Sequence, residues 1–419
     1  MTRRKLACAL ALFVLSLGGG TAAQSAQRPL LGVQADRGKP VTLRRLDGAT
    51  LRAVGAGVPL RGHGQAWSFS PDGSQLVLGS RGVATLGSPL KRASPPSLRF
   101  VDVRRMRVLR DVKLRGEAGF MHATAWLARN RVVVLLIDTR TARARLLLVD
   151  PAAGTVLRRR SLERGRMVMG GERTADGLLL LLAPGRQIGA AKLVAVDREL
   201  RLRAAVLDRI RAGSAQRGSG EDFVLARREP GLAVDAAGER AYVVGADEPV
   251  ASVDLRRLGV TYLEASAERQ PQLRQKSLEG PEREAVWLPN GLLAVSGETY
   301  AGLAKRRLVS EPAGLQLVDT QTGQARLLDP QARSVLRLGR RLVTAGADRG
   351  IVGYDLGGTR RYTALEDRKI VWLQAAGTRL VAQSDVGTVA VLDAVSGRVL
   401  AERRGPVAQL VSGSAARIW

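Results

Sequence analysis

Short segments that alternate between hydrophobic and polar residues, separated by turn residues, run along most of the chain. Residues 66–80 read AWSFSPDGSQLVLGS, in which two alternating segments flank the turn sequence SPDG. Pro71 presets φ for the first turn position, and Gly73 tolerates a positive φ. The pattern therefore predicts a β-hairpin rather than a helix.

The same hairpin pattern recurs along the chain. Its clearest further copies contain Trp126, Trp287 and Trp372, each in an apolar segment just before turn residues. Thinner copies lie at 174–177, 235–238 and 339–341. Repetition of one short supersecondary unit predicts a repeat architecture.

A second hairpin follows each first one. Its mark is a β-rich run ending in Asp, a short turn and another strand, as in LLLVDPAAGTVL, LQLVDTQTGQARLL and VAVLDAVSGRVL. The Asp side chain can cap the turn, and Gly can supply a left-handed residue. Units of about 49 residues with four short strands each are typical of a β-propeller. The terminal aspartates are Asp47, Asp102, Asp150, Asp197, Asp254, Asp319, Asp355 and Asp393.

The two ends of the chain predict how the ring closes. Residues 40–55 supply only a second hairpin, and residues 406–419 supply only an opening strand pair. Together they complete one blade, which removes an open sheet edge. We therefore expect an all-β fold with a single propeller domain over 28–419. Eight four-stranded blades are predicted, with seven as the alternative if a thin copy is spurious.

The N-terminus has the pattern of a secretory signal peptide. Basic residues at 3–5 precede an apolar run at 6–17, and small residues follow up to Ala23. Cleavage after Ala23 leaves a signal peptide of residues 1–23, with Ala26 as a second cleavage position. We expect an exported protein, extracellular or in the cell envelope, by the general secretory route or, given the paired arginines, the twin-arginine route.

Two features of the composition bear on function. Cys8, the single cysteine, lies within the predicted signal, so we expect the mature chain to have neither a disulfide nor a thiolate. The net charge is +28 and lysine occurs only eight times, so arginine carries most of it. This charge favours anionic partners, although arginine-rich codon usage is an alternative explanation, since the charges are dispersed. Aromatic residues are only 4%, which argues against a nucleic-acid-binding protein.

The repeats carry a family resemblance. WSFSPDGSQLVLGS resembles the first hairpin of WD40-like bacterial propellers, and LVDPAAGTVL, LVDTQTGQARLL and VLDAVSGRVLAE resemble quinoprotein-like propeller repeats. The resemblance implies the propeller architecture and no particular function. In quinoprotein alcohol dehydrogenases this hairpin ends in a docking Trp and a vicinal disulfide contacts the quinone. In this chain Leu157, Leu327 and Leu400 have no Trp after them, which argues against quinone-dependent catalysis.

The long insertions are predicted on one face of the propeller. Turns within hairpins lie on one face and are short in this chain, whereas connections between hairpins and between blades lie on the other. Loops longer than usual are often functional. We predict partner-binding loops on this second face, with Arg274, Lys276, Tyr300, Lys305 and Arg306 as contact residues. The insertions are 82–96, 184–191, 209–227, 264–282 and 297–312.

The innermost strands are predicted to begin on this same face, at the mouth of the central channel. Basic residues recur there, so we predict an anion-binding mouth, because guanidinium groups bind carboxylate or phosphate bidentately. Adjacent Glu229, Glu284 and Asp367 leave open the alternative that the charges pair internally. The tryptophans of the inner strands are expected to pack between blades. The predicted ligand-binding residues are Arg166, Arg228, Arg283, Arg333, Arg368, Lys369 and His122, with His63 at another strand start.

No catalytic residues are predicted. Two histidines and no mature cysteine leave no standard zinc site, and no G-x-S-x-G elbow occurs. No cofactor is expected; calcium is possible, with unknown ligands. The leading hypothesis is a monomeric, non-enzymatic scaffold binding a protein or an anionic envelope polymer. The alternatives are a metal- or cofactor-dependent propeller enzyme, either lactonase- or lyase-like or a degenerate quinoprotein, and a structural assembly platform.

Overall fold

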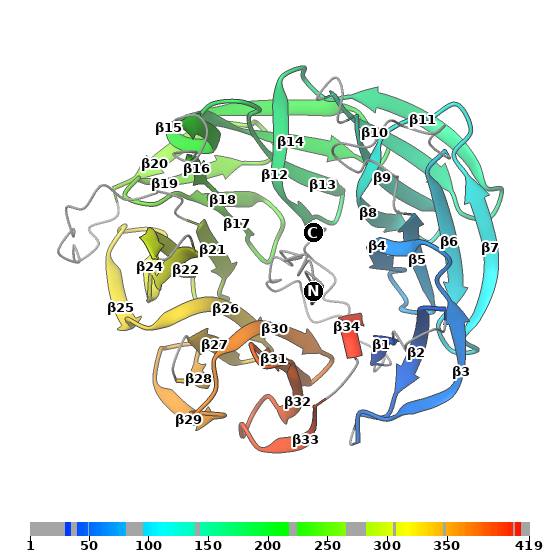
Figure 1. Cartoon of the computed structure of the whole chain (residues 1–419). Helices are drawn as coiled ribbons and strands as arrows, with labels where there is room; N and C mark the ends of the chain where they lie inside the picture. Colours follow the sequence, from blue (N-terminus) through cyan, green and yellow to red (C-terminus); the bar gives the residue numbers. More distant parts are fainter. Residues whose placement is uncertain are drawn as a thin grey trace, which may run out of the picture.

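The computed structural model describes residues 30–34, 40–48, 50–80, 95–138, 143–217, 224–264, 282–304, 307–346, 349–404 and 407–411. Every regular element in these residues is a β-strand, and the strands form a ring of sheets (Figure 1). None of these residues belongs to a helix long and apolar enough to cross a membrane. The predicted signal peptide lies outside the described residues.

Eight antiparallel sheets make up the ring, which confirms the predicted propeller and its eight blades. The blades are numbered around the ring, and the strands of each are named from the innermost outward. Blade 1 has β34 (Val407–Val411), β1 (Leu31–Gln34), β2 (Thr42–Leu46) and β3 (Ala53–Pro59); blade 2 has β4 (His63–Phe69), β5 (Gln75–Ser80), β6 (Ser97–Asp102) and β7 (Arg107–Lys113). Blade 3 has β8 (Phe120–Ala128), β9 (Arg131–Asp138), β10 (Arg143–Asp150) and β11 (Thr155–Ser161). Blade 4 has β12 (Arg166–Arg173), β13 (Gly177–Pro184), β14 (Gly189–Asp197) and β15 (Leu202–Arg217), with β16 (Val224–Arg228) added to β15.

The second half of the ring repeats this plan. Blade 5 has β17 (Gly231–Val234), β18 (Arg240–Val244), β19 (Val250–Asp254) and β20 (Val260–Leu263). Blade 6 has β21 (Glu282–Trp287), β22 (Leu292–Ala304), β24 (Leu315–Asp319) and β25 (Ala325–Asp329), and β23 (Arg307–Pro312) pairs with β22. Blade 7 has β26 (Ala332–Leu338), β27 (Arg341–Gly346), β28 (Ile351–Asp355) and β29 (Arg360–Ala364); blade 8 has β30 (Ile370–Ala376), β31 (Arg379–Ser384), β32 (Thr388–Asp393) and β33 (Val399–Arg404).

The ends of the chain share blade 1, as predicted, but the division between them differs from the prediction. Within the described residues, the N-terminal segment gives three strands and the C-terminal segment gives the innermost one, β34. The two-plus-two division was wrong because β1, with the sequence LGVQ, is too short to show an alternating pattern. Leu31 pairs with Arg45 on one side and with Val411 on the other, so β1 joins the two ends of the chain.

The position of a strand in its blade accounts for its composition. Middle strands are covered on both faces by neighbouring blades, so they are nearly continuous apolar runs, as in β9 (RVVVLLID) and β13 (GLLLLLAP). Outermost strands are exposed; β11 (TVLRRRS) has almost all of its side chains in solvent. Charged residues on such an edge strand oppose pairing with other chains.

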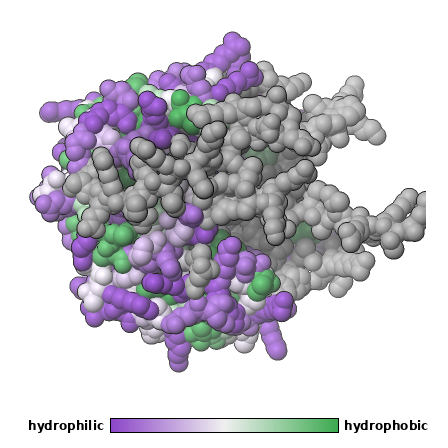
Figure 2. Space-filling view, turned by 60° about the vertical axis from the view of Figure 1, so that its left-hand side comes forward, coloured by the Kyte–Doolittle hydropathy of each residue, from purple (hydrophilic) through white to green (hydrophobic). Residues whose placement is uncertain are grey.

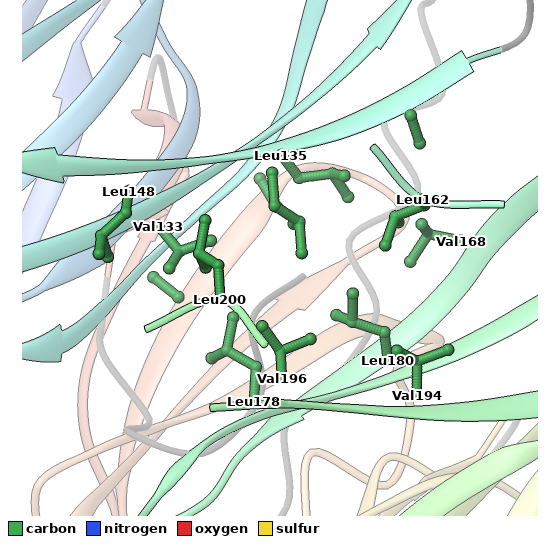
Figure 3. Close-up of a cluster of buried hydrophobic side chains, with 14 of the residues drawn as sticks. Val133, Leu135, Leu148, Leu162, Val168, Leu178, Leu180, Val194, Val196 and Leu200 are labelled. Atoms are coloured by element: carbon green, nitrogen blue, oxygen red, sulfur yellow. The ribbon is translucent and has the colours of Figure 1, made fainter. Parts of the chain in front are cut away.

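Apolar side chains between neighbouring blades form the core. The buried residues form eight clusters, and each cluster joins two successive blades. Between blades 3 and 4, Val133, Leu135 and Leu148 face Leu180 and Val194 across the gap between the two sheets (Figure 3). Each fully buried side chain of this kind contributes about 1.5–3 kcal/mol. No blade therefore has a core of its own.

The tryptophans pack between blades, as predicted. Trp126 meets Phe100 of blade 2 edge-on, with ring centroids 5.9 Å apart, and its Nε1 donates to the Ser68 carbonyl at 3.1 Å. Trp287 of blade 6 stacks on Tyr242 of blade 5 at 5.2 Å. Trp67 and Trp372 are partly buried in the clusters on either side of blade 1.

The eight predicted aspartates close the turns between the third and fourth strands. Each accepts backbone N–H groups through Oδ1; Asp319, for example, binds Gln321 N at 2.8 Å and Thr322 N at 2.9 Å. These hydrogen bonds favour the carboxylate, and they lower the pKa of Asp319 from its ordinary value of 3.8. The other seven, with the same kind of bond, are Asp47, Asp102, Asp150, Asp197, Asp254, Asp355 and Asp393.

A donor from the preceding blade binds a backbone carbonyl in most of these turns. Arg203 of blade 4 is the clearest case, with Nη1 2.7 Å from Arg256 O and Nη2 3.0 Å from Leu255 O in blade 5. We call this contact the inter-blade clasp. In five of the six cases the donor is an arginine on the outer strand, and in the sixth it is the hydroxyl of Tyr362. The other clasps are Arg110 to Ala152, Arg158 to Glu199, Arg326 to Gly357, Tyr362 to Ala394 and Arg403 to Leu51.

The clasp predicts that Arg203→Ala lowers the free energy of unfolding by about 1 kcal/mol, because two hydrogen bonds to carbonyls are lost. The matched control is Arg201→Ala, directly before β15. The exposed side chain of Arg201 pairs with Asp197 of its own turn, with Nε 3.2 Å from Oδ2. The control should cost less than about 0.5 kcal/mol. Urea denaturation measures both, and equal losses would contradict the clasp.

The turn aspartates predict a specific acid sensitivity. Hydrogen bonds from Thr322, Thr359 and Ser396 contribute to pKa values below the ordinary 3.8 for Asp319, Asp355 and Asp393. Their stabilisation is complete above this value and is lost as the pH falls through the lowered folded-state values.

The variant with all three aspartates changed to Asn keeps the turn acceptors but not the charges. Its unfolding temperature should fall less steeply below about pH 3.8 than that of the wild type. Thermal scans across acid pH measure the two slopes; parallel slopes would show that these carboxylates do not couple to folding.

Candidate functional site

One face of the ring carries the candidate site. Because each sheet is antiparallel and each innermost strand starts on the same side, the capped turns all lie on the opposite face. We call the side on which the innermost strands begin the mouth face, and the other side the turn face. Connections between second and third strands, and between successive blades, lie on the mouth face.

Two of the predicted insertions fold as β-hairpins that rise from the mouth face. β15 continues past its pairing with β14, and Gly213–Arg217 then pairs with β16. β22 continues past its pairing with β24, and Glu298–Ala304 pairs with β23. The expectation of loops was wrong here. The returning strand of each hairpin, VLARR or RLVSEP, contains valine and leucine, which favour strands.

The remaining insertions have different outcomes. The segment 184–191 is not a long loop, since β13 ends at Pro184 and β14 begins at Gly189. Most of 82–96 and 264–282 lies outside the described residues, and so do the proposed contact residues Arg274, Lys276, Lys305 and Arg306. Tyr300 lies in β22, and its side chain lies outside the described part of the structure.

The predicted mouth residues all lie at the mouth face, and four of their arginines contact carboxylates. Arg228 Nη1 is 2.9 Å from Glu248 Oε1 in the neighbouring blade, and Arg333 Nη1 is 3.1 Å from Glu298 Oε1 at the base of the β22–β23 hairpin. Sequence reasoning missed both carboxylates, because Glu248 lies in the connection between β18 and β19 and Glu298 lies in β22, each far along the chain from its arginine. Arg166 pairs with Glu163 at 3.4 Å, and Arg368 with Glu402 at 2.5 Å.

Arg283 is held differently. Its Nη1 donates to two backbone carbonyls, Glu282 O at 3.0 Å and Glu298 O at 3.2 Å. Within the described part of the chain, no carboxylate lies within ion-pair distance of its guanidinium. Burial lowers the pKa of Arg283, with Asp247 acting to raise it and Arg228 to lower it. Arg283 is therefore a partly buried cation beside a second cation.

Arg228 and Arg283 come together because blades 5 and 6 approach closely. The Glu229 carbonyl accepts from Arg283 N at 2.8 Å, and Glu229 bridges Glu282 in a parallel pairing. Gly231 makes this possible, since a Cβ there would lie 2.8 Å from Ala285 N and 2.9 Å from Arg283 O. Glu248 shares this junction; burial raises the pKa of its carboxyl despite hydrogen bonds from Arg211 N and Arg228.

The histidines at the strand starts are structural in character. His63 has Nδ1 2.9 Å from Leu60 O and Nε2 3.0 Å from Ser97 Oγ, and burial lowers its pKa. His122 is half-buried beside Phe120, with ring centroids 6.4 Å apart, and desolvation lowers its pKa too. Both rings therefore favour the neutral form at neutral pH.

A cleft of about 690 Å³ opens on the mouth face of blade 8. Arg368 and Lys369 line it together with Asp385, Glu402 and Arg404, so charges of both signs surround it. Asp385 N donates to the Lys369 carbonyl at 3.0 Å, which holds the two connections together. The cleft suits a polar ligand more than an apolar one.

The arrangement supports binding through polar contacts. On the side of the molecule drawn in Figure 2, the described residues are mainly hydrophilic, with hydrophobic ones scattered among them. In the described ranges, no three His, Cys, Asp or Glu side chains gather as a metal site would require. The chemistry present at the mouth face is that of guanidinium groups, carboxylates and exposed hairpin backbone.

No protein-family model matches the chain, and no curated protein matches it in sequence. Its three-dimensional structure does resemble solved proteins. One is the dihydro-heme d1 dehydrogenase NirN in complex with DHE, with a TM-score of 0.59 and 11% identity over 94% of this chain and 78% of that one.

Two further structures are similar. BamB from Moraxella catarrhalis has a TM-score of 0.50 and 16% identity, over 87% of this chain and 96% of that one. The computationally designed Ika8 protein has a TM-score of 0.52 and 15% identity, over 86% of this chain and 98% of that one. At these identities the likeness shows the β-propeller fold alone.

Proposed function

We propose that the protein is an exported, non-enzymatic binding scaffold that engages a protein or anionic ligand of the cell envelope through its mouth face. The observation that carries the proposal is the shared direction of the two inserted hairpins. β15–β16 and β22–β23 extend blades 4 and 6 on the mouth face, on either side of blade 5. The capped turns of the turn face stay short.

The geometry of the hairpins supports a role in recognition. Each is an extension of a strand already fixed in a blade, so its base is rigid. Glu298, at the base of β22–β23, is tied to Arg333 of blade 7. Arg228, at the end of β16, is tied to Glu248 of blade 5. A partner that contacts both hairpins would thus meet surfaces whose relative position is set by the ring.

The charge supports an anionic or acidic partner. The net charge of +28 gives the protein a positive field that attracts such partners and is screened by salt. Export places the protein, in this proposal, where anionic envelope polymers and envelope proteins are present. The signal-like segment at the N-terminus supports export.

Trimming the hairpins tests the proposal. Replacing 214–227 by two glycines leaves Gly213 opposite Arg228, a pair that a two-residue turn can close. Replacing 300–310 in the same way leaves Thr299 opposite Glu311. Saturable binding of each purified mature protein to envelopes of its native host, at low and high salt, is the measurement. Each trimmed protein should bind at least about ten-fold more weakly, a loss of about 1.4 kcal/mol.

The matched control changes exposed residues of the turn face. Gln321→Ala with Thr322→Ala leaves the backbone contacts to Asp319 in place and should bind like the wild type. Wild-type binding by both trimmed proteins, or equal loss in the control, would overturn the assignment to the mouth face.

A further inference from the structure

Arg283 differs from the other predicted mouth arginines in which groups contact its guanidinium. Arg166, Arg228, Arg333 and Arg368 each have a carboxylate oxygen within ion-pair distance. Around Arg283, the described residues provide two backbone carbonyls and no such carboxylate. Asp247 acts on Arg283 only from beyond ion-pair distance. A guanidinium that is taken partly out of water with no carboxylate in contact is destabilised, and it gains from an incoming anion.

The contacts of Arg283 leave one edge of the guanidinium open. The group has five N–H donors, and Nη1 uses its two on the Glu282 and Glu298 carbonyls. The Nε and Nη2 donors have no protein acceptor in the described structure. This is the edge that binds the two oxygens of a carboxylate in parallel. The two carbonyl contacts fix the plane of the group, so the open edge is already oriented.

The surroundings also favour an anion at this place. Arg228 adds a second positive charge, and although Glu248 pairs with it, Arg228 still disfavours the charge on Arg283. Arg283 is intermediate in exposure, neither fully buried nor free in solvent, so a small group can reach it. The close approach of β17 to β21 at Gly231 keeps the two arginines near each other.

We infer that Arg283 anchors a carboxylate-binding site at the junction of blades 5 and 6, in which Nε and Nη2 bind both oxygens of one carboxylate. The inference rests on the proposed binding function and names the chemical group recognised at the mouth face. The carboxylate belongs to an acidic side chain of a bound protein or to a free small acid; the two sources share this chemistry. Lysine cannot replace the arginine, since its ammonium group lacks the paired donors.

The experiment measures binding of two carboxylate probes by isothermal titration calorimetry at constant ionic strength. The probes are the capped peptide Gly-Glu-Gly, with Gly-Gln-Gly as its uncharged counterpart, and succinate. The variants are Arg283→Lys, which keeps the positive charge and removes the paired Nε and Nη2 donors, and Arg160→Lys, the same change at an exposed position of β11. Circular dichroism and thermal unfolding confirm that each variant folds.

The wild type should bind a carboxylate probe, and Arg283→Lys should weaken this binding at least about ten-fold, while Arg160→Lys leaves it unchanged. Preference for Gly-Glu-Gly over Gly-Gln-Gly identifies an acidic peptide as the source, and binding of succinate alone identifies a free acid. If neither probe binds, or if Arg283→Lys binds with the affinity of the wild type, the inference is overturned.

The protein with 214–227 replaced separates this inference from the proposed function. That variant keeps Arg283, Arg228 and Gly231, so it should still bind the probes. Probe binding without hairpin-dependent envelope binding would support the site and reject the scaffold role. Hairpin-dependent envelope binding without probe binding would support the scaffold role and reject the carboxylate site at Arg283.

Discussion

Burial of apolar side chains between neighbouring sheets is the interaction on which the rest of the structure depends. No four-stranded sheet of the described ring encloses a core; each covers both of its faces with the sheets beside it. The series must therefore close on itself, and it does so where Leu46 and Leu51 of blade 1 meet Val381 and Val391 of blade 8. In the closed ring, the turns between third and fourth strands lie on the turn face, and the innermost strands begin on the mouth face. The candidate site at the mouth face therefore depends on the same closure as the fold.

Arginine has three separate roles in this ring. On the outer strands it joins blades by binding carbonyls, as Arg203 does. At the mouth face it pairs with carboxylates from other strands, as Arg333 does with Glu298. Arg283 binds only carbonyls among the described residues and keeps its ion-pairing edge open. Some of the arginines are thus committed to internal contacts, although the net charge of the chain stays strongly positive. Among the predicted mouth arginines, Arg283 gives the clearest indication of a ligand.

Much of the fold could be predicted from the sequence because its determinants are local. The turn aspartates bind N–H groups two or three residues away, and the tryptophans repeat within one hairpin unit, so both are visible as patterns. The errors arose where the pattern was short or interrupted, as in β1 and in the two hairpins. The pairings of Arg228 and Arg333 could not be predicted in the same way, since Glu248 and Glu298 reach these arginines only when the ring brings separate segments of the chain together. The strand starts located the arginines, and the adjacent Asp367 was named as a candidate partner and lies 3.8 Å from Arg368. Glu163, Glu248, Glu298 and Glu402 were not named.

Removing the strand that closes the ring tests most directly whether the blades depend on one another. A chain ending at Arg404 lacks β34 and exposes the edge of β1, whereas a chain ending at Val411 retains the pairing. Thermal unfolding followed by circular dichroism, with hydrogen exchange of the middle strands, compares the two. If the blades stabilise one another around a closed ring, the shorter chain loses its single cooperative transition and protection falls in blades remote from β34. An unchanged transition with lost protection confined to blade 1 would contradict this dependence.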